Sequence, residues 1–344
     1  MATGRTGRIA AAGVAVAGLV GLGLLAAPAG AGAAPELPPV SPEDLVSSVL
    51  TADPGAFGGT VELDNALGLP ALPGMPQASD GTSTARVWTD GDRRGRVQLP
   101  TSNGERTLVS DGQTFWAWDS ESRTVTRVPE GEHPQGGPGG PDAANADPAA
   151  AATQLLAALR PTSEISVDGT AEVAGRPAYE LVLAPAASER TLLREVRVAV
   201  DAEHRMPLQL TVLATGSSDP ALQLGFTDIS FGAQDESLFS FTPPPGATVE
   251  DGQAPEGRPG GAPFQGTEPT VVGDGWDTVV VATAPADAAA PGTGELDGDE
   301  PSLAQLGTPV SGPWGSGRMI STAVATAIVT DDGRIAAGAC RSRS

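Results

Sequence analysis

Several residue types that carry common protein chemistry are scarce or missing in this chain of 344 residues. Lysine is absent, so all 20 basic residues are arginines, and a phosphate-binding loop that needs a lysine is excluded. One cysteine, Cys340, allows no intramolecular disulfide. The two histidines, His133 and His204, lie in a Pro/Gly-rich stretch and in a turn, outside any metal-ligand spacing. We therefore expect no catalytic residues, no cofactor and no metal.

Positive charge is also in short supply. The formal net charge is −22, and a surface this acidic repels nucleic acid and anionic membranes. The chain contains 45 glycines and 32 prolines, roughly twice average usage, which predicts long turns and linkers. We expect a monomer with no nucleic-acid partner.

The one long apolar run lies at the N-terminus. Arg5 and Arg8 precede an apolar stretch over residues 9–27, and small residues follow at 31–33. This order is typical of a secretory signal peptide, here residues 1–33, and predicts export to the cell envelope, the periplasm or the extracellular space. An uncleaved N-terminal anchor is the alternative.

Two helices are predicted. The first covers residues 41–50, with Ser41 as cap and Pro42 in the first turn. The second covers 148–160 and follows a Pro/Gly-rich linker over 129–149. Its apolar stripe consists of Leu155, Leu156 and Leu159. We expect this second helix to be tethered flexibly.

Strand patterns fill most of the remaining sequence up to residue 250. Short extended runs are predicted at 59–65, 84–89, 94–99, 106–110, 114–119 and 123–128. Asp90-Gly91 and Asp111-Gly112 are typical hairpin turns between them. Clear period-two alternation follows in four further runs, at 178–183, 195–201, 207–212 and 221–228. With no helix between them, these runs predict an antiparallel sheet with one apolar and one polar face.

The prolines at 243–245 are predicted to end this sheet. A second linker covers 251–270, and a C-terminal extension covers 271–344. Within the extension, residues 278–283 predict a strand. Ile320, Val324 and Ile328 recur every four residues and favour a helix, although their β-branched side chains leave a strand as the alternative.

The pattern as a whole indicates an α+β fold, in which a strongly curved antiparallel sheet is covered on its concave face by the two helices. A cover on a flexible tether could lift. An apolar cavity under such a cover suggests binding of an apolar ligand. An ordinary filled core is the alternative, and periodicity alone favours it.

Two segments resemble a known family. The segment TLVSDGQTFWAWDSESRTVTRV (residues 107–128) is similar to a strand pair of LolA-type lipoprotein carriers, and FSFTPPPGATVEDGQ (239–253) is similar to their closing segment. The motifs occur in the family's order. The resemblance covers roughly residues 41–253, and the domain that it implies covers 41–250. It implies an incomplete barrel with helices as a lid over a cavity for the acyl chains of a lipoprotein or lipid.

The resemblance leaves a second function open. Regulators of the RseB type share this architecture, which implies an anti-sigma factor or another membrane-anchored envelope protein as partner. The extension from residue 271 is not part of the basic carrier. In the family, an arginine in a loop is thought important for cargo transfer, and its nearest counterpart here is Arg93 or Arg94.

The ligand-binding residues expected on this basis come from the strand pair, the second helix and the alternating strands. They are Trp116, Trp118, Leu155, Leu156, Leu159, Leu181, Val198, Leu210 and Leu224. Trp116 and Trp118 point to one face of their strand. They line the cavity, fill an ordinary core, or brace the sheet from outside.

Overall fold

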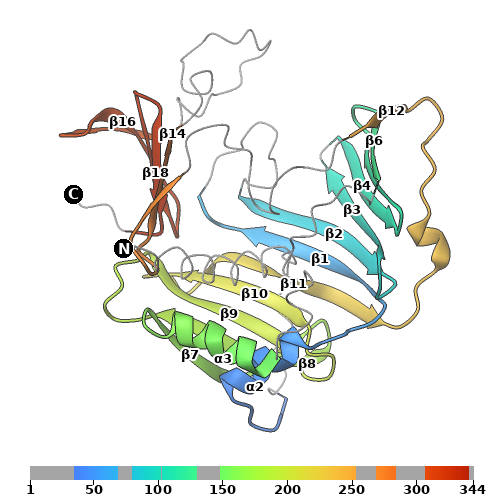
Figure 1. The fold of residues 1–344 in the computed structure, drawn as a ribbon, viewed down its shortest axis with the longest axis horizontal. Coiled ribbons are helices and arrows are strands. Elements are labelled where there is room, and N and C mark those ends of the chain that lie inside the picture. The colour runs from blue at the N-terminus through green and yellow to red at the C-terminus, as the bar shows by residue number, and fades with distance from the viewer. Residues whose placement is uncertain are drawn as a thin grey trace, which may run out of the picture.

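The structure, a computed structural model, describes residues 35–68, 80–101, 103–129, 148–252, 269–283 and 307–340. Two β-sheets account for most of these residues, and two short helices lie together beside one end of the larger sheet (Figure 1). The predicted signal peptide over 1–33 and most of both predicted linkers fall outside the described residues. Among the described residues, no helix is long and apolar enough to span a membrane.

The larger sheet has 12 strands and does not close into a barrel, as predicted. Its spatial order is β12-β6-β5-β4-β3-β2-β1-β11-β10-β9-β8-β7. In chain order the strands are β1 (Phe57–Asn65), β2 (Gly81–Thr89), β3 (Arg94–Thr101), β4 (Gly104–Asp111), β5 (Thr114–Asp119), β6 (Thr124–Pro129), β7 (Ser163–Val173), β8 (Arg176–Pro185), β9 (Leu193–Asp201), β10 (Pro207–Ala214), β11 (Pro220–Phe231) and β12 (Thr248–Asp251).

Both predicted helices are present. In α2 (Pro42–Leu50), the Ser41 hydroxyl accepts a hydrogen bond from the Asp44 backbone N–H at 3.1 Å, as expected of an N-cap. The second helix, α3 (Pro148–Leu159), packs mainly against α2 within the described residues.

The first strand after α3 was not predicted. β7 forms the edge of the sheet, and its pairing with β8 slips between Val167 and Thr170. Gly169, inside this irregularity, has a φ of +89°, which suits glycine. The Asp168-Gly169 dipeptide therefore interrupts the alternation at a bulge within one long strand.

The expectation that the prolines at 243–245 end the sheet is wrong. After β11 the chain forms a short 3-10 helix, η2 (Glu236–Phe239), passes through the prolines and then forms β12. β12 pairs in parallel with β6 at the far edge. The prolines lie outside the ladder, so their missing N–H groups break no sheet hydrogen bond.

The C-terminal extension contains a separate six-stranded sheet. Its spatial order is β13-β14-β18-β17-β16-β15, and its strands are β13 (Thr270–Val272), β14 (Val279–Thr283), β15 (Thr308–Gly312), β16 (Gly315–Ser321), β17 (Thr326–Thr330) and β18 (Arg334–Gly338). We call this sheet, with its connections, the C-terminal module.

The helix predicted around Ile320, Val324 and Ile328 is wrong, and the strand alternative is correct. β16 and β17 flank a tight turn in which the Thr322 hydroxyl accepts from the backbone N–H groups of Val324 and Ala325. Such side-chain bonds to the local backbone compete with a helix, and β-branched residues fit a strand better. Ile320 lies in β16, Val324 in the turn and Ile328 in β17, so their four-residue spacing imitates a helix by coincidence.

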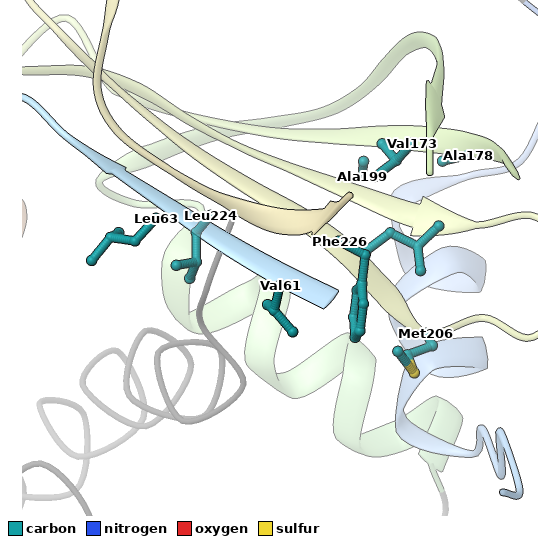
Figure 2. Close-up of a cluster of buried hydrophobic side chains, with 9 residues drawn as sticks. Val61, Leu63, Val173, Ala178, Ala199, Met206, Leu224 and Phe226 are labelled. Atoms are coloured by element: carbon teal, nitrogen blue, oxygen red, sulfur yellow. The ribbon is translucent and has the colours of Figure 1, made fainter. Parts of the chain in front are cut away.

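The core of the larger sheet has two buried clusters. One contains Val61, Leu63, Leu224 and Phe226 from β1 and β11, together with Met206 and neighbours. In Figure 2 these four strand residues point to the side on which the helices are drawn. The second cluster joins α2 to β8 and β9 through Leu45. Together they place a continuous apolar layer on one face of β1, β11, β10, β9 and β8.

Candidate functional site

One line of aliphatic side chains crosses five strands in register. Leu181 on β8 is paired with Val198 on β9, which is paired with Leu210 on β10. Leu210 is paired with Leu224 on β11, and Leu224 with Leu63 on β1. We call these five residues the aliphatic row. Because paired residues point to the same face and strands lie about 4.8 Å apart, the row spans roughly 19 Å.

Four of the predicted ligand-binding residues belong to this row, so the structure brings them together as expected on one face. A second row runs alongside, one side chain further along each strand. It consists of Leu183, Val196, Val212 and Leu222. These four residues and Leu210 are half-buried, whereas the other members of the aliphatic row are buried. We call the two rows together the apolar face.

The helix directly on the apolar face is α2. Its Leu45 side chain is 0% exposed and packs in one cluster with Tyr179, Leu181 and Val198. Leu37 and Val40, from the segment that precedes α2, pack against the same cluster. Leu45 was not among the predicted ligand-binding residues, and neither was Leu63.

The leucines predicted on α3 occupy a second layer. Leu156 is buried, Leu155 and Leu159 are half-buried, and their helix packs mainly on α2 within the described residues. Beyond the end of α3, Arg160 forms an ion pair with Glu43 of α2. The side chain that the structure places against Leu181 and Val198 is therefore Leu45 of α2, with α3 stacked behind it.

Trp116 and Trp118 lie on the opposite face from the aliphatic row. The face of Leu63 continues through Val87 on β2, Val97 on β3 and Leu108 on β4 to Ala117 on β5, without a register shift. Because neighbours along a strand point to opposite faces, the two tryptophans point away from this face. The structure does not bring them together with the four aliphatic residues.

The tryptophan face is occupied by the segment after β11. The Trp116 ring lies 5.6 Å from the ring of Phe241, and its Nε1 donates to the Asp111 carboxylate at 3.1 Å. Phe239 is 2% exposed, and the Arg94 guanidinium lies 5.2 Å from its ring centroid. The segments 107–128 and 239–253, which carry the family resemblance, thus pack against each other as scaffold.

Asp111 is held as an anion by this packing. Burial by itself raises the pKa of this carboxyl, but hydrogen bonds from the Trp116 indole and from the backbone N–H groups of Gln113 and Thr114 outweigh it and lower the pKa. A carboxylate that accepts three hydrogen bonds inside a turn serves structure.

A fully buried carboxylate closes the β9–β10 hairpin. Asp201 is 0% exposed and accepts hydrogen bonds from Arg176 Nε at 2.5 Å and from the backbone N–H of Glu203 at 3.0 Å. Burial raises the pKa of Asp201, but the hydrogen bonds from Arg176 and from the His204 and Glu203 backbone lower it overall. His204 itself stacks on Phe231, with ring centroids 3.6 Å apart.

The C-terminal module docks beside β7 through a small set of hydrogen bonds. The Trp276 indole donates to the Ser163 hydroxyl at 2.7 Å, and the Trp276 backbone N–H donates to the Glu189 carboxylate at 2.8 Å. The Leu192 backbone N–H donates to the Ala339 carbonyl at 2.7 Å. We call these contacts the docking contacts. Ser163 begins β7 directly after α3, so they lie next to the end of that helix.

The chain's one cysteine and the one histidine in the described residues both make structural contacts. Burial, reinforced by Asp277, raises the pKa of the Cys340 thiol, which disfavours the reactive thiolate. His204 contacts an aromatic ring, and His133 lies outside the described residues. Within the described part of the chain, no three His, Cys, Asp or Glu residues converge as metal ligands would.

Comparisons with known proteins give matches among solved structures alone. No family model matches the chain, and no curated protein matches it. The complex of MucB with MucA from Pseudomonas aeruginosa matches with 17% identity, over 86% of this chain and 91% of that chain, with a TM-score of 0.43. An uncharacterised conserved protein from Thermus thermophilus matches with 14% identity, over 61% of this chain and 96% of that chain, with a TM-score of 0.35.

A LolA superfamily protein from Nitrosomonas europaea matches with 12% identity, over 59% of this chain and 99% of that chain, with a TM-score of 0.24. The matched structures thus include the family that residues 107–128 and 239–253 resemble. At these TM-scores the likeness is distant.

Proposed function

We propose that this protein is an exported carrier that holds the acyl chains of a lipid or lipoprotein on the apolar face, beneath α2. The observation that carries the proposal is the aliphatic row, five in-register side chains whose direct helical cover in the described residues is α2. An acyl chain laid along such a row meets aliphatic side chains over roughly 19 Å.

The energetics favour an acyl chain as the ligand. Burial of each methylene group contributes about 0.8 kcal/mol, so a dozen methylenes contribute roughly 10 kcal/mol before the costs of binding. The face offers no buried ionisable side chain among its nine residues that would have to be desolvated. The half-buried second row, with Val212 and Leu222, provides further apolar surface for the same chain.

The cover can exchange with the ligand. α2 has nine residues, and helices this short are marginal without tertiary contacts. The packing of α2 on the sheet depends on Leu45 and a few neighbours. An acyl chain that takes the place of Leu45 would bury the same apolar surface and so offset the free energy lost when α2 moves away. α3 would move with α2, because the Arg160–Glu43 ion pair joins them.

Export belongs to the same proposal. Residues 1–33 have the order of a signal peptide, and the acidic chain suits a soluble envelope protein. The proposal includes no catalytic step, so the protein would act by binding and release.

The test combines extraction with uptake by two matched variants. The protein purified from its native cells is extracted with organic solvent, and the delipidated protein is titrated with a fluorescent fatty acid. Val212→Asn places an amide on the apolar face, whereas Thr211→Asn changes the neighbouring residue on the opposite face of β10. We expect Val212→Asn to weaken uptake about tenfold or more, and Thr211→Asn to leave it unchanged.

Two results would overturn the carrier proposal. One is the absence of both co-purifying lipid and saturable uptake by the unaltered protein. The other is equal uptake by the unaltered protein and Val212→Asn, because a ligand indifferent to the apolar face does not bind there.

A second function is favoured by the C-terminal module. Its sheet exposes Val272 at 56% and Val280 at 42%, and the β15–β16 turn exposes Trp314 at 38%. Large apolar side chains exposed on a small module suit a protein partner, such as an anti-sigma factor or another membrane-anchored envelope protein. Photo-crosslinking in cells from position 314 separates the two functions, since a regulator yields one stable membrane-anchored adduct whereas a carrier yields none from this position.

A further inference from the structure

The turn between β9 and β10 carries an arginine where the backbone favours glycine. The Asp201 backbone N–H donates to the Met206 carbonyl at 2.9 Å, and the Arg205 N–H donates to the Asp201 carbonyl at 3.2 Å. These bonds close the hairpin with Arg205 at a φ of +56°, in the left-handed region. Glycine and asparagine adopt this conformation more readily, so the arginine occupies this position against the backbone preference.

The Arg205 side chain reaches back to the end of the apolar face. Its guanidinium carbon lies 5.0 Å from the ring centroid of Tyr179. Tyr179 belongs to the cluster beneath α2, with Leu45, Leu181 and Val198. The cation is therefore held at one end of the surface proposed for the acyl chain.

The carboxylates of the same turn do not neutralise this cation. Asp201 and Glu203 both form ion pairs with Arg176, at 2.5 Å and 3.0 Å. The Arg205 Nη1 atom is buried and has no hydrogen-bond partner. A buried guanidinium N–H without an acceptor is unusual in a folded protein and calls for an explanation.

We propose that Arg205 binds the anionic head group of an amphiphile whose acyl chain lies on the apolar face. The inference rests on the proposed carrier function and specifies its ligand class as a carboxylate or phosphate attached to an acyl chain. A guanidinium matches the two oxygens of such a group with paired N–H donors. The head group would supply the acceptor that Nη1 lacks, while the chain passes Tyr179 toward Leu181 and Val198.

Binding requires the cover to move. Leu37 and Val40, in the segment before α2, pack against the cluster that contains Tyr179. The Thr170 hydroxyl donates to the Pro35 carbonyl at 2.7 Å and so fixes the start of this segment to β7. Displacement of α2 and this segment would expose the Tyr179 ring, over which the Arg205 guanidinium lies, so chain and head group would enter by one opening.

The experiment compares ligands with one tail and different heads. The mature full-length protein is titrated calorimetrically, below micelle formation, with dodecyl phosphate, with 1-dodecanol and with inorganic phosphate. Arg205→Asn removes the guanidinium but suits the left-handed backbone, so the variant should fold. Arg205→Lys keeps the charge without the paired donors, and Arg86→Asn is the control, because Arg86 is exposed and lies on the opposite face.

We expect the unaltered protein and Arg86→Asn to bind dodecyl phosphate about tenfold or more tightly than 1-dodecanol. Arg205→Asn should bring this ratio close to one without changing the affinity for 1-dodecanol, and Arg205→Lys should give an intermediate ratio. Inorganic phosphate should not bind measurably.

Other outcomes separate the two proposals. If the unaltered protein binds neither amphiphile, the carrier function itself fails. If it binds both equally, if Arg205→Asn keeps the preference for phosphate, or if inorganic phosphate binds as tightly as dodecyl phosphate, the carrier function stands and the role of Arg205 is refuted. The ratio of the affinities of the unaltered protein for dodecyl phosphate and for 1-dodecanol distinguishes the two proposals even if a variant does not fold.

Discussion

Leu45 of α2 and Val198 of β9 are packed in one buried cluster, at 0% and 2% exposure, and this contact joins the helical layer to the sheet. Leu45 comes from the first helix after the predicted signal peptide, and Val198 from a strand more than a hundred residues later. The cover of the apolar face therefore depends on one helix that is remote in sequence from the strands it covers.

Truncating Leu45 should destabilise the protein and loosen its cover. We expect Leu45→Ala to lower the free energy of unfolding by about 2–5 kcal/mol, because a fully buried leucine leaves a cavity. Leu50→Ala, at a position on the same helix that is 50% exposed, should change it by about 0.5 kcal/mol or less. Urea titration measures both values, and similar losses in the two variants would contradict the placement of Leu45.

A charge on the apolar face should be far more damaging than one on the opposite face. Val198→Glu buries a carboxylate and should cost several kcal/mol. Arg197→Glu is not a neutral control, because Arg197 pairs with Glu180 and Glu195, and the change would gather three carboxylates. The exposed Arg86 on the opposite face is the better site, and Arg86→Glu should cost about half a kcal/mol or less. Equal thermal midpoints for Val198→Glu and Arg86→Glu would show that the register is wrong.

The Arg176–Asp201 pair should give stability a specific pH dependence. The pKa of Asp201 is lowered in the folded protein, so its contribution is present above the unfolded pKa of about 3.9 and is lost as pH falls through the folded value. Arg176→Met leaves a buried, unpaired carboxylate and should cost roughly 3–5 kcal/mol at pH 7.

The deficit of Arg176→Met should shrink on acidification, because protonation of Asp201 removes the buried charge. Urea midpoints at pH 7, 5 and 3.5 follow this change. In the control, the deficit caused by Arg176→Met is measured in a protein that already carries Asp201→Asn, against Asp201→Asn alone, and this deficit should not vary with pH through residue 201. A deficit of Arg176→Met that stays constant from pH 7 to 3.5 would rule out the pair as its source.

The docking contacts of the C-terminal module can be followed with the chain's one cysteine. Cys340 is half-buried, its thiol donates to the Asp277 carbonyl at 3.3 Å, and its backbone bridges to Thr191. Trp276→Phe removes the hydrogen bond to Ser163 and should raise the rate of thiol modification several-fold. Trp314→Phe, at an exposed site in the same module, should leave the rate unchanged. Equal rates in both variants would show that Trp276 does not hold the module.

Local patterns predicted much of the larger sheet. The run 114–119 has the bounds of β5, and Leu181, Val198, Leu210 and Leu224 were placed on one face, because strict alternation leaves one register possible. β7 was missed where the Asp168-Gly169 bulge breaks the alternation. The C-terminal helix was predicted because a turn and two strands imitated helical spacing.

The arrangement of the layers could not be predicted in the same way. Which of two apolar helices reaches the sheet depends on tertiary packing, so Leu45 rather than Leu156 meets Leu181. The face of Trp116 follows from register counted over several strand pairs. Arg205 carried no signal in the sequence, because its significance rests on a left-handed backbone and on an unpaired atom that appear only in three dimensions.

The irregularity in β7 has a consequence for the behaviour of the protein at high concentration. β7 is an 11-residue strand at the edge of a 12-stranded sheet, and a straight edge of that length is a template for another copy of the chain. The bulge at Asp168 and Gly169 breaks this edge into two short segments, and both bulge residues are exposed, one of them with a negative charge. Such an edge resists edge-to-edge pairing with another copy of the chain and amyloid-like stacking. The protein therefore stays monomeric more readily while its apolar face is open.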